Sequence, residues 1–236
     1  GRERARHVRP PTPTSRPPMS APAPPAYASL YPTAPTSPAD DAAARQALAR
    51  QGFPPGLQAA AVRSRAAFGA RYWIVDNSGS MSLPDGKRLV AAGASERLVA
   101  CTRWQEATQA ALHAGELAAA LGAPTEFRFL NAPASGPQSL TVAGPEDLPA
   151  LRAACESEPS GGTPLCAHAV AVATDIAARR AELAARGQRA SVTIVSDGLP
   201  SDGDLAAALQ PFASLPMWIV VRLCTNEEEG VNFWNG

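Results

Sequence analysis

The chain has 236 residues, of which 45% are hydrophobic and 24 are proline. This length suits one domain with an additional segment, and the apolar content is sufficient for a substantial core. Lys plus Arg and Asp plus Glu both number 21, so no overall field favours nucleic acid or an anionic membrane surface as a partner. No run of about 18 apolar residues occurs in the sequence, which argues against a membrane span.

The cysteines form no CxxC pair, and two of them lie in apolar strand or helix patterns, as buried thiols do. This pattern favours a reducing compartment, and we therefore expect a cytoplasmic protein. The four cysteines are Cys101, Cys155, Cys166 and Cys224.

The amino-terminal part of the chain is rich in proline. Eleven of the first 40 residues are proline, and Ala, Ser and Thr fill most of the rest. Such a segment cannot bury enough apolar surface to offset the entropy lost on ordering. We expect residues 1–41 to form a disordered tail with polyproline II character.

Two short motifs lie in this tail, and both depend on preformed polyproline II structure. One is PPAY, which contains Pro24, Pro25 and Tyr27 and matches a WW-domain ligand. The other is PTAP, from Pro32 to Pro35, which matches a peptide read by an endosomal sorting component. These motifs leave open a function as a trafficking or ubiquitin-ligase adaptor that acts mainly through its tail.

Residues 42–68 have apolar side chains at every third or fourth position, interrupted at residues 52–55 by Gly-Phe-Pro-Pro. We expect two short helices that form a linker between the tail and a domain over residues 69–236.

The domain alternates strand and helix patterns, starting with the apolar run 72–76, which we expect to be the first and central strand. Alternation of this kind predicts an α/β fold with a doubly wound, mostly parallel sheet and helices on both faces. Only residues 226–236 follow the last strand, so we expect the domain to be truncated at its C-terminus. The further elements expected are a hairpin of strands 88–92 and 98–102, a helix from a Thr102/Gln105 capping box to Gly122, strands 125–130 and 138–142, a helix 145–155, a helix 164–186 capped by Thr163, a strand 191–195, a helix 202–210 and a strand 217–224.

Three loops carry the polar groups that point to a function. They are residues 76–80 (DNSGS), 160–164 (SGGTP) and 196–198 (SDG). Each lies at the carboxyl end of an expected strand or at the start of an expected helix, the edge where open α/β sheets bind ligands. All three offer oxygen ligands without His or Cys, which favours Mg²⁺ or Mn²⁺ over zinc.

These three loops, in this order, resemble the metal ion-dependent adhesion site of von Willebrand factor A domains. By that resemblance Asp76, Ser78 and Ser80 form the DxSxS motif, Thr163 is the threonine ligand and Asp197 is the distant aspartate. The resemblance implies a Rossmann-like fold that binds Mg²⁺ or Mn²⁺, with one coordination place left for an Asp or Glu of a protein partner. It covers residues 71–224, and the hairpin before Thr102 departs from the simplest layout of the family.

We therefore predict a divalent-metal-dependent, protein-binding module that acts as an intracellular adaptor, with an extracellular adhesion domain as the alternative. We do not predict an enzyme. A hydrolase built from Ser78, His168 and Asp197 is disfavoured, because Ser78 lies in NSGS rather than in a GxSxG elbow and His168 lies on a packed helical face. The SGGTP loop also lacks the lysine of a phosphate-binding P-loop.

Overall fold

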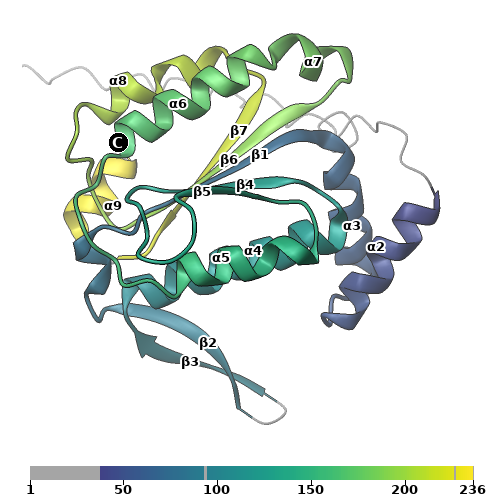
Figure 1. The fold of residues 1–236 in the computed structure, drawn as a ribbon, viewed down its shortest axis with the longest axis horizontal. Coiled ribbons are helices and arrows are strands. Elements are labelled where there is room, and N and C mark those ends of the chain that lie inside the picture. The colour runs from purple at the N-terminus through teal and green to yellow at the C-terminus, as the bar shows by residue number, and fades with distance from the viewer. Residues whose placement is uncertain (1–37, 93–94, 226, 236) are drawn as a thin grey trace, which may run out of the picture.

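The protein has a five-stranded mixed sheet with helices on both faces (Figure 1). The computed structural model describes residues 38–92, 95–225 and 227–235. The strand order is β5-β4-β1-β6-β7, and a separate two-stranded sheet pairs β2 with β3. Only β5 runs antiparallel to its neighbour. The strands of the large sheet are β1 (Phe68–Val75), β4 (Thr125–Phe129), β5 (Ser139–Val142), β6 (Arg189–Ser196) and β7 (Met217–Leu223).

Strand β1 is the central strand, as predicted, and it separates two halves of the core. Successive side chains of a strand point to opposite faces. Tyr72 and Ile74 accordingly pack in one apolar cluster, whereas Trp73 and Val75 pack in the other. The near-continuous apolar run in the sequence follows from this burial on both faces.

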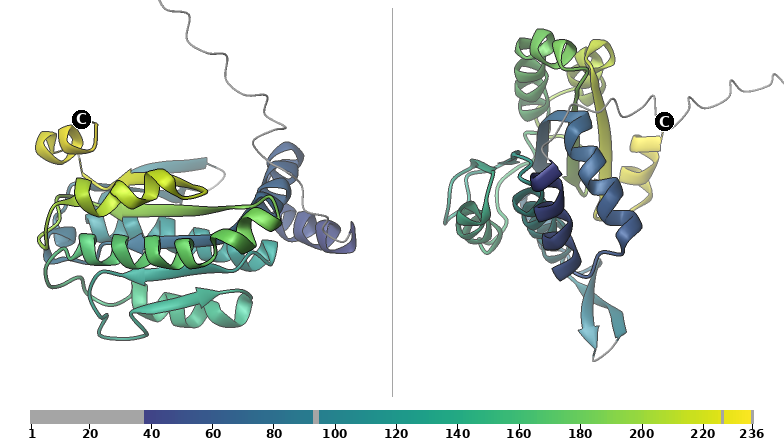
Figure 2. Two further views of the ribbon diagram at one scale, coloured as in Figure 1. Left: turned by 90° about the horizontal axis from the view of Figure 1, so that it is seen from above. Right: turned by 90° about the vertical axis from the view of Figure 1, so that its right-hand side faces the viewer.

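The two faces are covered by different helices (Figure 2). Helices α4 (Arg103–Leu121) and α5 (Leu148–Cys155) pack against one face. Helices α6 (Leu165–Ala178), α7 (Arg180–Ala185) and α8 (Leu205–Leu209) pack against the other. A further helix, α9 (Glu228–Asn235), follows β7 and was not predicted.

The sequence signals at the ends of α4 are confirmed. Thr102 and Gln105 form the predicted capping box, in which each side chain bonds the other residue's backbone amide. Gly122 ends the helix in the left-handed conformation, with φ of 57°, which glycine adopts without steric cost.

The predicted helix 164–186 is wrong in two respects. It is divided into α6 and α7 at Arg179. Thr163 does not cap it, because the residue before the first turn is Pro164 and no side chain of that segment makes a cap hydrogen bond. The free amides of Cys166 and Ala167 donate instead to the carboxylate of Asp202, from a distant loop. A helix terminus can be satisfied by any nearby acceptor, and the local sequence did not reveal this one.

Shorter elements complete the chain and refine the other predictions. The expected helix 145–155 begins with the turn η2 (Pro145–Asp147), and the helix expected over 202–210 is α8 followed by η3 (Gln210–Ser214). The predicted hairpin is present as β2 (Gly86–Ala92) and β3 (Ser95–Cys101). Among the described residues, none of the helices is both long and apolar enough to cross a lipid bilayer.

Helices α2 (Pro38–Arg50) and α3 (Pro55–Ala67) match the two short helices expected before the domain. Residues 38–41, expected to belong to the tail, form the first turn of α2, whereas residues 1–37 lie outside the described part. Leu48 and Val62 pack against Leu121 at the end of α4. The two helices therefore share an apolar cluster with the domain.

We expect Leu48→Ala to destabilise the protein by about 2–5 kcal/mol, the usual cost of removing a fully buried leucine side chain. Chemical denaturation followed by circular dichroism would measure this. Leu57→Ala is the matched control, because Leu57 lies on α3 and is 56% exposed. Equal stability of the two variants would show that the packing of α2 against α4 contributes nothing.

Candidate functional site

The candidate site begins where two neighbouring parallel strands end. Val75 of β1 is paired with Val195 of β6, so the next residues, Asp76 and Ser196, lie side by side. The amide of Asp76 extends the ladder by donating to the carbonyl of Val195 at 2.8 Å. The chain leaves β1 toward β4 on one side, and β6 leads to β7 on the other. The site therefore lies at the switch point, where open α/β sheets bind ligands.

Asp76 is fully buried, and its carboxylate accepts two hydrogen bonds. Its Oδ1 accepts the amide of Ser78 at 2.9 Å, and its Oδ2 accepts the hydroxyl of Ser196 at 2.6 Å. Burial raises the pKa of Asp76, the hydrogen bonds from Ser196 and Ser78 counteract this rise, and the charge of Asp197 adds to it. The carboxylate is thus fixed in orientation by its hydrogen bonds.

A line of hydroxyl groups connects this aspartate loop to the second carboxylate. The hydroxyl oxygens of Ser78 and Ser80 are 3.1 Å apart. The Ser80 hydroxyl donates to Oδ1 of Asp197 at 3.1 Å. Ser80 lies in the turn η1 (Gly79–Ser82), for which Ser78 is the N-cap residue. Four of the five residues predicted to bind the metal are therefore connected in one hydrogen-bonded network.

The loop that carries Thr163 lies against the same aspartate loop through backbone contacts. The amide of Gly79 donates to the carbonyl of Gly161 at 3.1 Å, and the amide of Ser160 donates to the carbonyl of Asn77 at 2.8 Å. Gly161 has φ of +87°, and a Cβ there would lie 2.6 Å from Oδ1 of Asn131. Glycine is thus required at this position both by conformation and by space.

Thr163 itself is held through its backbone. Its amide donates to the hydroxyl of Ser201 at 2.9 Å, and its carbonyl accepts the amide of Ser201. Within the described part of the chain, its own hydroxyl makes no hydrogen bond that joins it to the line of serines and aspartates. The structure therefore brings the Thr163 loop beside that line without bonding the Thr163 side chain into it.

Two asparagines that hold the loops together were not predicted from the sequence. Asn77 receives the amide of Asn131 on its side-chain oxygen at 2.7 Å and donates to the Asn131 carbonyl at 2.9 Å. Asn131 in turn donates from its side chain to the carbonyl of Gly162 at 2.8 Å. Asn131 follows β4 after one intervening residue, Leu130, and a polar residue just after a strand, as at Asp76, was the signal that could have identified it.

The sequence analysis also missed Arg103, the first residue of α4, whose side chain is only 3% exposed. Its guanidinium contacts Asp197 Oδ2 at 2.8 Å, Asp85 at 2.6 Å and Glu227 at 2.6 Å. The hydrogen bond to Asp85 is the main cause that raises the pKa of Arg103, and burial opposes it. Arg103 lowers the pKa of Asp85 in return. An arginine in the first turn of an amphipathic helix usually lies in solvent, so its position gave no signal of burial.

These oxygens fit a hard cation in their chemistry. Carboxylates and hydroxyls are ligands that Mg²⁺ and Mn²⁺ accept. Each carboxylate oxygen of Asp76 and Asp197 makes one of the hydrogen bonds described above, and such an oxygen has a second acceptor site. Among the described residues, no group of three or more His, Cys, Asp or Glu side chains is placed so that it could hold a metal ion, so a cation here depends on the serine and threonine hydroxyls as well.

The other residues singled out in the sequence lie away from this site or outside the described part. His168 is half-buried, and its Nε2 lies 3.2 Å from the carbonyl oxygen of Leu130. Burial lowers the pKa of His168. The motif residues Pro24, Pro25, Tyr27, Pro32 and Pro35 fall within residues 1–37 and are therefore not described.

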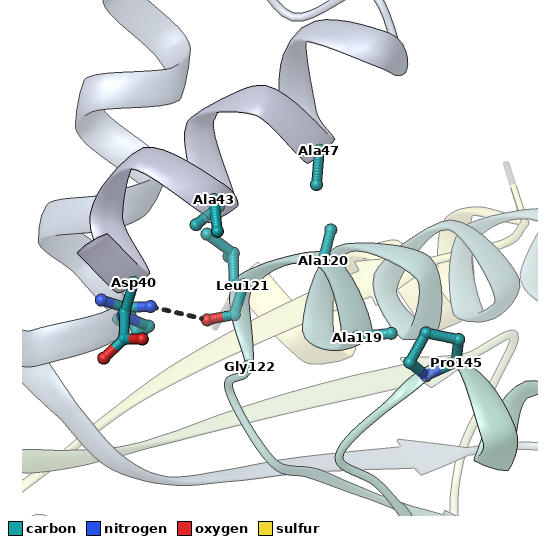
Figure 3. Close-up of a pocket in the computed structure, with 10 residues that line it drawn as sticks. Asp40, Ala43, Ala47, Ala119, Ala120, Leu121, Gly122 and Pro145 are labelled. Carbon is teal, nitrogen blue, oxygen red and sulfur yellow. Dashed lines mark hydrogen bonds between the residues drawn. The ribbon is translucent and has the colours of Figure 1, made fainter. Parts of the chain in front are cut away.

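A hollow of about 760 Å³ lies elsewhere, between α2 and the end of α4. Its walls are mainly alanine side chains, among them Ala43, Ala47 and Ala120 (Figure 3). The Arg65 guanidinium at its rim donates to the Leu121 carbonyl and to Asp41. The hollow offers no group of oxygen ligands comparable to that at the strand ends.

The comparisons with known proteins give no assignment: no protein-family model matches the sequence, and no curated protein matches it.

We expect Arg103→Met to destabilise the protein by about 3 kcal/mol or more, because removing one partner of a buried ion pair leaves Asp197 uncompensated. Thermal and chemical unfolding would measure this. Arg152→Met is the control: that side chain is 55% exposed and lies 3.9 Å from Glu116, so its loss should cost less than about 1 kcal/mol. Similar costs for the two variants would contradict a structural role for Arg103.

Proposed function

We propose that this chain is a von Willebrand factor A-type domain that binds protein partners through a divalent cation, Mg²⁺ or Mn²⁺. The observation that carries the proposal is the hydrogen-bonded line Asp76, Ser78, Ser80, Asp197 at the ends of β1 and β6. Ser80 and Asp197, two of the residues that carry the resemblance in sequence, are 117 positions apart in the chain. Their proximity in space supports a common role.

Each of these residues has a distinct task in the proposed site. Asp76 and Asp197 supply negative charge, and Ser78, Ser80 and Thr163 supply neutral hydroxyl oxygens. A bound cation would provide the positive charge that attracts a carboxylate of the partner. Two carboxylates balance the charge of one divalent cation, and with the neutral hydroxyls they leave a place in a six-coordinate shell for an additional Asp or Glu from outside.

Arg103 strengthens this dependence on the partner. Its guanidinium lies 2.8 Å from Asp197 Oδ2 and offsets part of the negative charge that a cation would otherwise use. Charges in a buried site are weakly screened. We therefore propose that the cation alone is held weakly, and that a partner carboxylate increases its occupancy.

The cysteines support an intracellular module over an extracellular adhesion domain. All four are buried free thiols, whereas small extracellular domains are commonly stabilised by disulfides. Burial raises the pKa of both Cys155 and Cys224 to about 12. Binding is also favoured over hydrolysis, because the hydroxyl of Ser78 is paired with that of Ser80 and His168 contacts a backbone carbonyl.

We expect Asp76→Asn to abolish Mg²⁺ and Mn²⁺ binding in titration calorimetry, because it removes one of two charged ligands while keeping the side-chain shape. Asp175→Asn is the control, since Asp175 lies on α6 and pairs with Arg128. Each titration is run with the protein alone and with a high concentration of acetate as a minimal carboxylate. If the wild type binds neither Mg²⁺ nor Mn²⁺, with or without acetate, the proposed function is wrong.

A further inference from the structure

The hairpin of β2 and β3 projects from the body of the domain beyond α4 (Figures 1 and 2). Its two strands are antiparallel, with Lys87 opposite Ala100 and Leu89 opposite Leu98. It is a two-stranded sheet separate from the large one. A hairpin of this kind has two edges, each with backbone groups that require partners.

Helix α4 satisfies the edge formed by β2. The amide of Lys87 donates to the Glu106 carboxylate at 2.8 Å. The amide of Leu89 donates to the side-chain oxygen of Gln109 at 3.2 Å, and the Gln109 side-chain amide donates to the Leu89 carbonyl at 2.7 Å. The backbone groups of Lys87 and Leu89 therefore point away from β3.

The edge formed by β3 is open. In an antiparallel pair, opposite residues either exchange hydrogen bonds or both point outward. Because Lys87 and Leu89 point outward, their partners Ala100 and Leu98 also point their amides and carbonyls outward, on the far edge of β3. Within the described residues, no group bonds to the backbone of Leu98 or Ala100 at that edge.

Beside this edge, Leu89, Leu98 and Ala100 share one face of the hairpin with Lys87 and Glu96, and Arg97 lies with Val99 on the opposite face. Leu89 and Leu98 lie opposite each other on the outer face and are 50% and 61% exposed. Arg97 points to the opposite face, since side chains alternate along a strand, and it is also exposed. Residues 86–101 contain Lys87, Arg88 and Arg97 against Glu96, a net charge of +2 in a chain whose net charge is zero.

We infer that the open edge of β3 binds an extended peptide of a partner protein, in which acidic and aliphatic residues alternate. The peptide would add a third strand to the hairpin, with main-chain hydrogen bonds to Leu98 and Ala100. Its aliphatic side chains lie beside the Leu89 and Leu98 pair, and its acidic side chains lie on the opposite face beside Arg97. This inference goes beyond the proposed function, because it requires no cation.

The test is fluorescence polarisation of the full chain with a labelled heptapeptide in which Glu and Val alternate, measured in EDTA. We expect saturable binding that weakens as salt is added, because the charge attraction is screened. A peptide with Lys in place of Glu should bind at least about tenfold more weakly. N-methylation of two adjacent central residues removes amides on both edges of the peptide and should abolish binding.

Two variants of the protein locate the binding surface. Leu98→Ser and Arg97→Glu should each weaken binding about tenfold or more. Leu57→Ser is the matched control, because Leu57 is similarly exposed but lies on α3, and it should leave binding unchanged. Circular dichroism establishes that each variant is folded.

Three results would overturn the inference. One is no binding of the Glu-Val peptide by the folded wild type, and a second is equal binding of the N-methylated peptide. The third is a dimer in solution that Leu98→Ser dissociates, without peptide binding, which would make a second copy of the chain the occupant. Because the assay contains EDTA, peptide binding and cation binding can fail independently.

Discussion

Two carboxylates, Asp76 and Asp197, are buried at the ends of adjacent parallel strands, and the surrounding structure compensates them. Burying a charge without a partner costs far more than a domain can tolerate. Asp76 is fully buried and is held by Ser78 and Ser196. Asp197 is held by Ser80 and by Arg103. The loops after β1 and β6 are thus tied to each other by the need to satisfy these two groups.

Arg103 extends this requirement to segments that are distant in sequence. It begins α4, and its guanidinium joins the end of β6 to Asp85, next to the hairpin, and to Glu227, just before α9. Of the three carboxylates, only Asp197 is buried, whereas the Glu227 side chain is 61% exposed. The ion pair between Arg103 and Asp197 therefore contributes more to stability than the other two pairs, because exposed pairs are screened by water and salt.

Local sequence signals predicted most elements but not the contacts between distant loops. The apolar run of β1 and the capping box of α4 depend on neighbours in sequence, and both predicted elements are confirmed. The start of α6 was mispredicted because its free amides bond to Asp202, which lies 36 residues away from Cys166. The convergence of Asp76, Ser78, Ser80 and Asp197 was expected from the rule that parallel strands end at one edge. The burial of Arg103 had no local signal. The polar residue after β4 could have identified Asn131 but not its pairing with Asn77, because that pairing depends on how the loops pack.

The most direct test of the account is a crystal structure of the protein grown with Mn²⁺ and a high concentration of acetate, with anomalous scattering used to locate the ion. The account predicts one Mn²⁺ peak at the ends of β1 and β6, within coordination distance of an Asp76 or Asp197 oxygen and of at least one serine hydroxyl. An ordered crystal with Mn²⁺ bound only elsewhere, or with the Arg103 guanidinium still bonded to Asp197 and no Mn²⁺ peak between the aspartates, would contradict it.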